Sequence, residues 1–354
     1  MIICKYFDIR MSSLVIVYFV VLLLAWNNRP LKNHGVIFLV CLLFASRPMG
    51  VPDTINYYDI FHYSMDDIMM QYEYGYRYLN YICHDILKMD FNSYLFIISL
   101  FMLEGWYYCT KRLLPQAHYG VLFLLFFSFY GIYYDGIVIR NALGIVICYI
   151  GFLLLEKPYK YKYILYYLFV ILAFLMHVGT VLFALVPFLR KPLKKRTLII
   201  WSLINISLVV FVRIDFIHGI LDRLFAFEEL SRLSNFQNDE NVAEQRISLF
   251  FILNYILSVF VIFLRDKVHP PRLDLYNFFL NIFIYGVFLN CLTSSINAGS
   301  RAGDQFIYFS SIPVYLACYE STLFNKNTGR LVMYILSGLY FFALTHYFPN
   351  ILNY

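Results

Sequence analysis

YYDGIVIRNALGIVICYIGFLLL, residues 133–155, is almost entirely apolar but carries one arginine, Arg140, near its start. A helix needs about 20 mainly apolar residues to cross a bilayer. A charge inside such a segment is costly unless it faces a bundle interior or a wet cavity. The stretch therefore predicts a membrane-spanning helix that begins near Asp135 and holds Arg140 about one turn inside.

Similar apolar runs recur along the whole chain. Of the 354 residues, 61% are hydrophobic and 14% are charged, and the mean hydropathy is +0.66. A soluble domain carries about 25% charged residues, so this composition indicates an all-α, polytopic transmembrane bundle of about twelve spans in one integral membrane domain, residues 1–354. The predicted spans are 12–26, 34–46, 93–109, 117–134, 136–155, 161–176, 178–189, 197–213, 247–264, 275–293, 304–319 and 331–348.

Several classes of protein and site are disfavoured. The net charge of +6 comes from short basic clusters between apolar runs, so it does not indicate nucleic-acid binding. The cysteines lie mostly in apolar runs, where a thiol behaves as a small hydrophobe, and no spacing typical of a metal site is present. P-loop and GxGxxG patterns are also missing. We therefore expect no cofactor and no metal.

Basic residues gather in alternate connections, most densely over 190–196. The positive-inside rule assigns these connections to the cytoplasm. The opposite, outer side then receives 294–303 and two long segments, 47–92 and 214–246. Loops of this length are often functional, and 47–92 is rich in tyrosine.

The segment 47–92 also carries more acidic than basic side chains. Its acids are Asp53, Asp59, Asp66, Asp67, Glu73, Asp85 and Asp90, and its basic residues are Arg47, Arg77 and Lys88. We expect this segment and 214–246 to form short helices over a cleft that opens to lipid.

Polar residues from separate parts of the chain converge near the outer interface in this topology. Arginine forks bind phosphate oxygens in a bidentate manner, and a nearby carboxylate can accept a proton from a sugar hydroxyl. Each residue also has a structural interpretation, such as an interfacial anchor or, for Arg140, an ion pair with Asp135. The candidates are Arg47, Asp53, Glu73, Asp135, Arg140, His177 and Arg301.

At these positions the chain resembles the EpsG-type family of Wzy-like polysaccharide polymerases. Arg47, Gly50, Asp53, Thr54, Tyr57 and Phe61 follow the order of the family's opening stretch. Glu73-Tyr74-Gly75-Tyr76 is similar to its E-P-G-aromatic motif, with tyrosine for proline, and Ile139-Arg140-Asn141 to its I-R-Q motif, with asparagine for glutamine. His177 and Arg301 match a histidine and an arginine of the pattern.

The resemblance implies an inverting membrane glycosyltransferase of the GT-C-like class in the bacterial cytoplasmic membrane, acting on its periplasmic face. Its substrates would be undecaprenyl-pyrophosphate-linked oligosaccharides, joined into O-antigen, capsule or exopolysaccharide. Membrane lipid surrounds such an enzyme, and a flippase and a chain-length regulator are implied partners.

The resemblance also suggests roles for the candidate residues. Arg47, Arg140, Arg301 and Tyr57 would bind pyrophosphate or substrate. Asp53, Glu73, Arg140 and His177 would be catalytic, with Asp53 or Glu73 as the base.

Three alternatives remain open at this point. An O-antigen ligase would use the same donor with another acceptor. A lipid-linked oligosaccharide flippase also has about twelve helices, but flippases usually show related halves and a charged lumen. A membrane O-acyltransferase would need a deeper catalytic histidine, and His177 is the one candidate in the sequence.

Overall fold

A computed structural model describes residues 12–26, 30–156, 158, 160–212, 249–293, 300–347 and 349–353. In these residues the ordered elements are helices, apart from one isolated β-bridge between Val268 and Ser321. The predicted all-α class is therefore confirmed. The predicted outer segment 214–246 lies outside the described residues.

The predicted apolar segments coincide with helical stretches. The first eight contain α1 (Ser13–Leu24), α2 (Pro30–Ala45), α5 (Phe91–Leu113), α6 (Tyr119–Phe126) with α7 (Ile132–Gly136), α8 (Ile139–Leu155), α9 (Lys162–Met176), the 3-10 helix Val178–Arg190 and α10 (Lys195–Val212). The last four contain α13 (Leu249–Leu264), α14 (Leu273–Leu292), α15 (Ser300–Ile307) with α16 (Ser311–Tyr319), and α17 (Lys326–Tyr347).

Three helical stretches of the described chain are long and apolar enough to cross a membrane: Leu249–Lys267, Pro270–Leu292 and Lys326–His346. The bent pair Tyr119–Gly136 and Ile139–Leu155 gives a fourth if it counts as one span, and several apolar helices are shorter. The chain is therefore an all-α membrane protein. The number of about twelve crossings stays a prediction.

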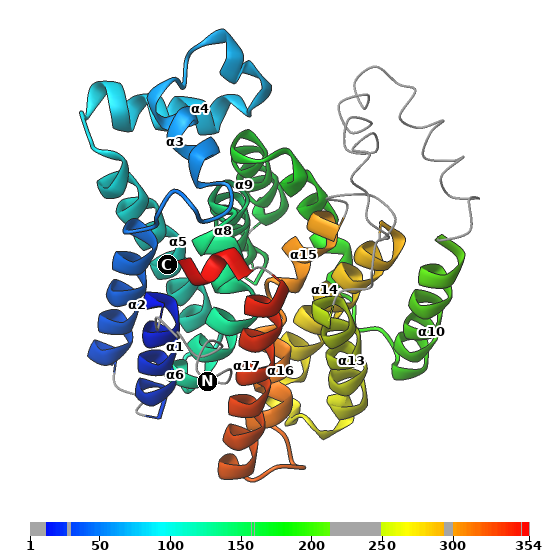
Figure 1. Cartoon of the computed structure of the whole chain (residues 1–354). Helices are drawn as coiled ribbons and strands as arrows, with labels where there is room; N and C mark the ends of the chain where they lie inside the picture. The colour runs from blue at the N-terminus through cyan, green and yellow to red at the C-terminus, as the bar shows by residue number, and fades with distance from the viewer. Residues whose placement is uncertain are drawn as a thin grey trace. The chain divides into compact units, whose positions relative to one another are not determined.

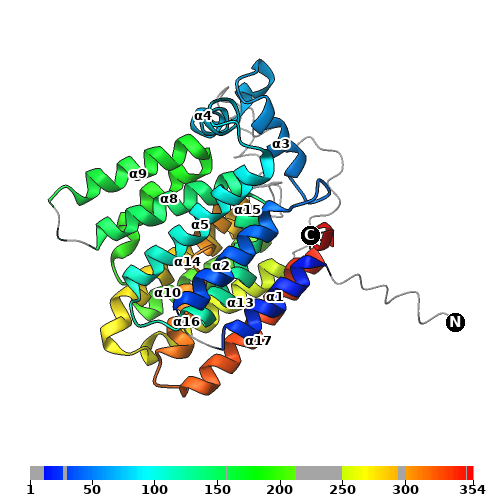
Figure 2. The ribbon, with the colours of Figure 1, turned by 90° about the vertical axis from the view of Figure 1, so that its left-hand side faces the viewer.

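Contacts divide the chain into two compact units. Unit 1 comprises Met1–Ala184 and Tyr334–Tyr354, and unit 2 comprises Leu185–Met333. In unit 1, α2 packs on α5, α5 on α8, and α8 on α9, so that these four helices form a row (Figure 2). Small residues permit the close approaches, since a Cβ on Gly105 of α5 would lie 2.7 Å from Val146 of α8.

Short helices fill the segment 47–92, as predicted. They are α3 (Thr54–His62), the 3-10 turn Asp67–Gln71, α4 (Tyr74–Tyr81) and the π-helical turn Ile82–Ile86. In Figure 1, α3 and α4 lie together at one end of unit 1, and α4 packs against α9 as well as α3.

The segment around Arg140 differs from the sequence prediction of a helix that begins near Asp135. Instead, α7 ends at Gly136, the chain bends by 120°, and α8 begins at Ile139. Glycine and β-branched residues have low helix propensity, and the break falls at Gly136, Ile137 and Val138. Arg140 is therefore the second residue of a new helix rather than one turn inside a longer one.

Candidate functional site

Glu73 precedes the first residue of α4, in extended backbone. Its position depends on how closely α4 approaches α9, and Gly75 permits that approach because a Cβ there would lie 2.7 Å from both the Cβ and the carbonyl oxygen of Leu175. The carboxylate of Glu73 then accepts a hydrogen bond of 2.9 Å from the backbone N–H of Val178. The turn after α9 thus fixes Glu73.

Arg140 forms an ion pair with Glu73, in which Nη1 lies 3.0 Å from Oε2. The side chains are 21% and 16% exposed, so water only partly screens the pair. The ring of Tyr72 lies on the guanidinium, with Cζ 5.0 Å from the ring centroid. The structural interpretation from the sequence was an ion pair between Arg140 and Asp135. The ion pair observed for Arg140 is with Glu73.

His177 completes this cluster from a third segment of the chain. It ends α9 in extended backbone, and its Nδ1 lies 3.2 Å from Oε1 of Glu73. The chain then turns back beside α9, because the Tyr166 hydroxyl donates to the carbonyl of Phe183 at 2.6 Å. Three residues singled out from the sequence, Glu73, Arg140 and His177, are therefore in direct contact; we call them the Glu73 cluster.

The environment of Glu73 favours its ionised form. Burial by itself would raise the pKa of Glu73, but the contact with His177, the positive charge of Arg140 and the Val178 N–H together lower it from 4.5 to about 2. Hydrogen bonds and opposite charges on a carboxylate act in this direction. Glu73 is therefore a weak proton acceptor near neutral pH.

Arg47 is buried and has a structural contact. Its Nη2 donates to the carbonyl oxygen of Gly136, the last residue of α7. Its Cζ lies 6.0 Å from the centroid of the Tyr57 ring, while Nε and Nη1 have no hydrogen-bond partner in the described residues. A cation at a helix C-terminus complements the helix dipole. Arg47 thus stabilises the break that precedes α8.

Asp53 begins α3 in the left-handed backbone region, with φ of 61°. Its side chain does not cap the helix, and in the described part of the chain it makes no ion pair or hydrogen bond. Non-glycine residues held at positive φ often lie at functional sites. The carboxylate of Asp53 is therefore available, unlike that of Glu73.

Tyr57 is a buried residue of α3, the helix that follows Asp53. Its ring packs edge-on against Tyr76 at 6.2 Å. Burial raises the pKa of Tyr57, and the charges of Arg140, Asp53 and Arg47 also act on its hydroxyl. Of these charged side chains, that of Arg47 contacts the Tyr57 ring, at 6.0 Å from Cζ to the centroid.

Arg301 is the second residue of α15 and belongs to unit 2, whereas the other candidates belong to unit 1. Its role stays a prediction.

The sequence interpretation gave no role in the cluster to three contributors: Tyr72, Gly75, which it named only as part of a motif, and the backbone of Val178. Adjacency is the signal that points to them, since Tyr72 and Gly75 flank Glu73, and Val178 follows His177. Their roles depend on contacts between distant segments, which the sequence pattern does not contain.

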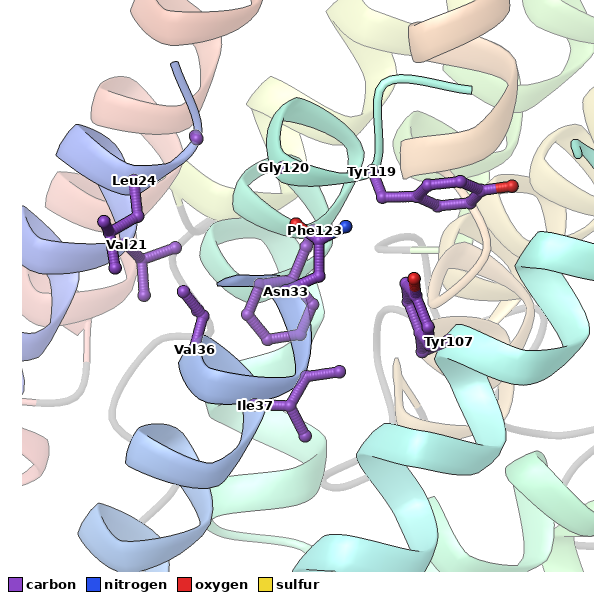
Figure 3. A pocket seen from close by; sticks show the side chains of 10 residues that line it. Val21, Leu24, Asn33, Val36, Ile37, Tyr107, Tyr119, Gly120 and Phe123 are labelled. Atoms are coloured by element: carbon purple, nitrogen blue, oxygen red, sulfur yellow. The ribbon is translucent and has the colours of Figure 1, made fainter. Parts of the chain in front are cut away.

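A separate pocket in unit 1 contains none of the candidate residues (Figure 3). It lies between α1, α2, α5 and α6, and Val36, Tyr107 and Phe123 are among its lining residues.

Within the described ranges, no three His, Cys, Asp or Glu side chains lie close enough together to hold a metal ion. The predictions of metal and cofactor independence stay predictions.

Comparison with known proteins gives one result. The model of the EpsG family matches residues 34–354, which includes every candidate residue. No curated protein and no solved structure matches the chain.

Proposed function

Because the chain belongs to the EpsG family, we propose that it is a membrane glycosyltransferase that polymerises undecaprenyl-pyrophosphate-linked oligosaccharide repeat units into O-antigen, capsule or exopolysaccharide. The family indicates a polymerase-like membrane protein. The observation that carries the finer proposal is the Glu73 cluster, which presents a guanidinium at the start of a helix in a membrane protein.

Arg140 is the group that we assign to the diphosphate of the donor. It is partly exposed, and it lies in the first turn of α8, where helix N–H groups and the helix dipole favour an anion. A fixed positive charge stabilises the negative charge that develops on a leaving diphosphate.

Asp53 is the better candidate for the base. Glu73 is held by Arg140, His177 and the Val178 N–H, and its low pKa opposes proton uptake. The side chain of Asp53 makes no hydrogen bond or ion pair in the described residues. We therefore assign Glu73 and His177 to positioning Arg140.

The proposed reaction is a single displacement. A hydroxyl oxygen of the acceptor sugar forms a bond to the anomeric carbon of the donor while the bond from that carbon to the diphosphate oxygen breaks. The hydroxyl proton passes to Asp53, and undecaprenyl diphosphate leaves with both bonding electrons. This step inverts the anomeric carbon.

We place this chemistry on the outer face of the bacterial cytoplasmic membrane. The basic residues of 190–196 support this orientation. Cysteines introduced as Asp66→Cys and Lys194→Cys test it, because a membrane-impermeant thiol reagent should label the first and spare the second. The reverse pattern would place the cluster in the cytosol and overturn the proposal.

Gene deletion followed by gel analysis of the surface glycan tests the function. A polymerase mutant should lose long chains and still display single repeat units. Surface glycan without even one unit would indicate a flippase or a ligase instead.

A further inference from the structure

Helix α4 carries a row of three tyrosines on its surface: Tyr74, Tyr78 and Tyr81, the tyrosine row. The rings of Tyr74 and Tyr78 are stacked at 6.0 Å with 9° between their planes, and those of Tyr78 and Tyr81 at 6.2 Å with 28°. Tyr74 is 62% exposed and Tyr78 45%. The row is therefore ordered within itself and still accessible.

Arg77 lies on the same helix and is nine-tenths buried. Its guanidinium carbon is 5.8 Å from the centroid of the Tyr74 ring, and its Nε has no hydrogen-bond partner in the part of the chain that the structure describes. No carboxylate of the described residues forms an ion pair with it. A buried donor without a partner is costly unless a ligand or water supplies the acceptor.

The row is fixed beside the Glu73 cluster. Tyr74 is the first residue of α4 and follows Glu73 directly, and the close contact between Gly75 and Leu175 holds α4 against α9. A ligand on the row would therefore lie next to the proposed site of group transfer.

We propose that the tyrosine row and Arg77 form a subsite for the sugars of the lipid-linked repeat unit. This inference rests on the proposed function. Aromatic faces offer apolar area with a polar hydroxyl edge, which suits a sugar ring with C–H faces and hydroxyl edges. The planar guanidinium would donate to sugar oxygens.

Charge favours a sugar over a membrane surface as the occupant. Segment 47–92 has more acids than bases, with Asp66, Asp67 and Asp85 among them. An acidic segment gains no electrostatic attraction from an anionic bilayer surface, which attracts basic segments. A neutral oligosaccharide needs no such electrostatic attraction to bind.

Direct binding tests the subsite without relying on polymerisation. The probe is the repeat-unit oligosaccharide, released by mild acid from the lipid-linked pool of the deletion strain. Its affinity is measured on the purified full-length protein in detergent. We expect the double variant Tyr74→Leu with Tyr78→Leu, and separately Arg77→Gln, to weaken binding about tenfold or more. Tyr74→Trp with Tyr78→Trp should keep it.

Tyr63→Leu is the matched control, because Tyr63 is 54% exposed in the same segment but lies outside the row; its affinity should equal that of the wild type. Thermal unfolding identifies any misfolded variant. The double leucine variant and Arg77→Gln are tested separately, so one of them still tests the subsite if the other does not fold. Wild-type affinity in the folded leucine variant would identify the row as a membrane anchor and overturn the subsite, as would absence of binding by the wild type. Failure of the proposed function shows separately, in the glycan of the deletion strain.

Discussion

Glu73 Oε2 lies 3.0 Å from Arg140 Nη1, and this ion pair joins the residue before α4 to the first turn of α8. The carboxylate offsets the unfavourable placement of a guanidinium at the positive end of a helix. It also holds the fork of Arg140 in one place. Pre-positioned charge of this kind is what a diphosphate leaving group requires.

A first prediction concerns the close contact between Gly75 and Leu175. Gly75→Ala would place a Cβ 2.7 Å from backbone and side-chain atoms of Leu175, so α4 must move and Glu73 should lose the Val178 hydrogen bond. We expect shorter or no polymer and a lower melting temperature. Gly35→Ala is the matched control, since a Cβ there meets nothing within 4 Å. Equal behaviour of the two variants in glycan gels and melting curves would refute this packing role.

A second prediction concerns the pH dependence of stability, and it follows from the pKa of Glu73. The pKa lies near 2 in the folded protein and its ordinary value is 4.5, so the contacts of Glu73 with His177, Arg140 and the Val178 N–H together contribute about 3 kcal/mol to the free energy of unfolding. Because the folded pKa is the lower one, this contribution is complete above pH 4.5 and is lost as the pH falls toward 2.

Thermal unfolding between pH 7 and pH 3 checks this dependence. The wild type should lose its advantage over Glu73→Gln as the pH decreases, while the exposed-acid control Asp66→Asn follows the wild type. Parallel curves for the wild type and Glu73→Gln would show that the ion pair contributes no pH-dependent stability.

Asp53 carries a third prediction. Asn also tolerates the left-handed backbone, so Asp53→Asn should keep the fold and protein abundance. Loss of a general base should reduce polymerisation about a hundredfold or more. Asp67→Asn, at an exposed position of the same segment, should leave the rate unchanged. A folded Asp53→Asn protein that makes normal polymer would show that Asp53 is not the general base.

A fourth prediction concerns metal ions. Arginine side chains are proposed to hold the diphosphate, so polymerisation by purified protein should continue in EDTA. Loss of activity that a single divalent ion restores would contradict this, and one of the acids near Arg140 would then be a ligand.

Much of the fold was predictable because lipid imposes a simple rule. A segment that crosses hydrocarbon must be apolar and must satisfy its own backbone hydrogen bonds, so apolar runs such as 93–109 and 161–176 mark helices. The break between α7 and α8 was predicted near Asp135, but it falls at Gly136, Ile137 and Val138. Gly136 and two β-branched residues follow one another there, but hydropathy does not register a bend.

The site was predictable in its membership and not in its contacts. Glu73, Arg140 and His177 stood out because charged or titratable groups beside apolar runs are costly. Their pairing was hidden because it depends on the approach of α4 to α9 at Gly75, a tertiary contact. Asp135 is closer to Arg140 in sequence and therefore was the more obvious partner.

The decisive measurement is polymer formation by Arg140→Ala and Arg140→Lys in the deletion strain, with membrane abundance of each protein measured in parallel. The double variant that exchanges the charges, Arg140→Glu with Glu73→Arg, separates catalysis from structure. If Arg140 binds the donor diphosphate, Arg140→Ala abolishes polymer at normal abundance, Arg140→Lys keeps weak activity because it retains charge without the fork, and the exchange restores nothing. Near-normal polymer from a stable Arg140→Ala protein, or full recovery in the exchange, would contradict the account.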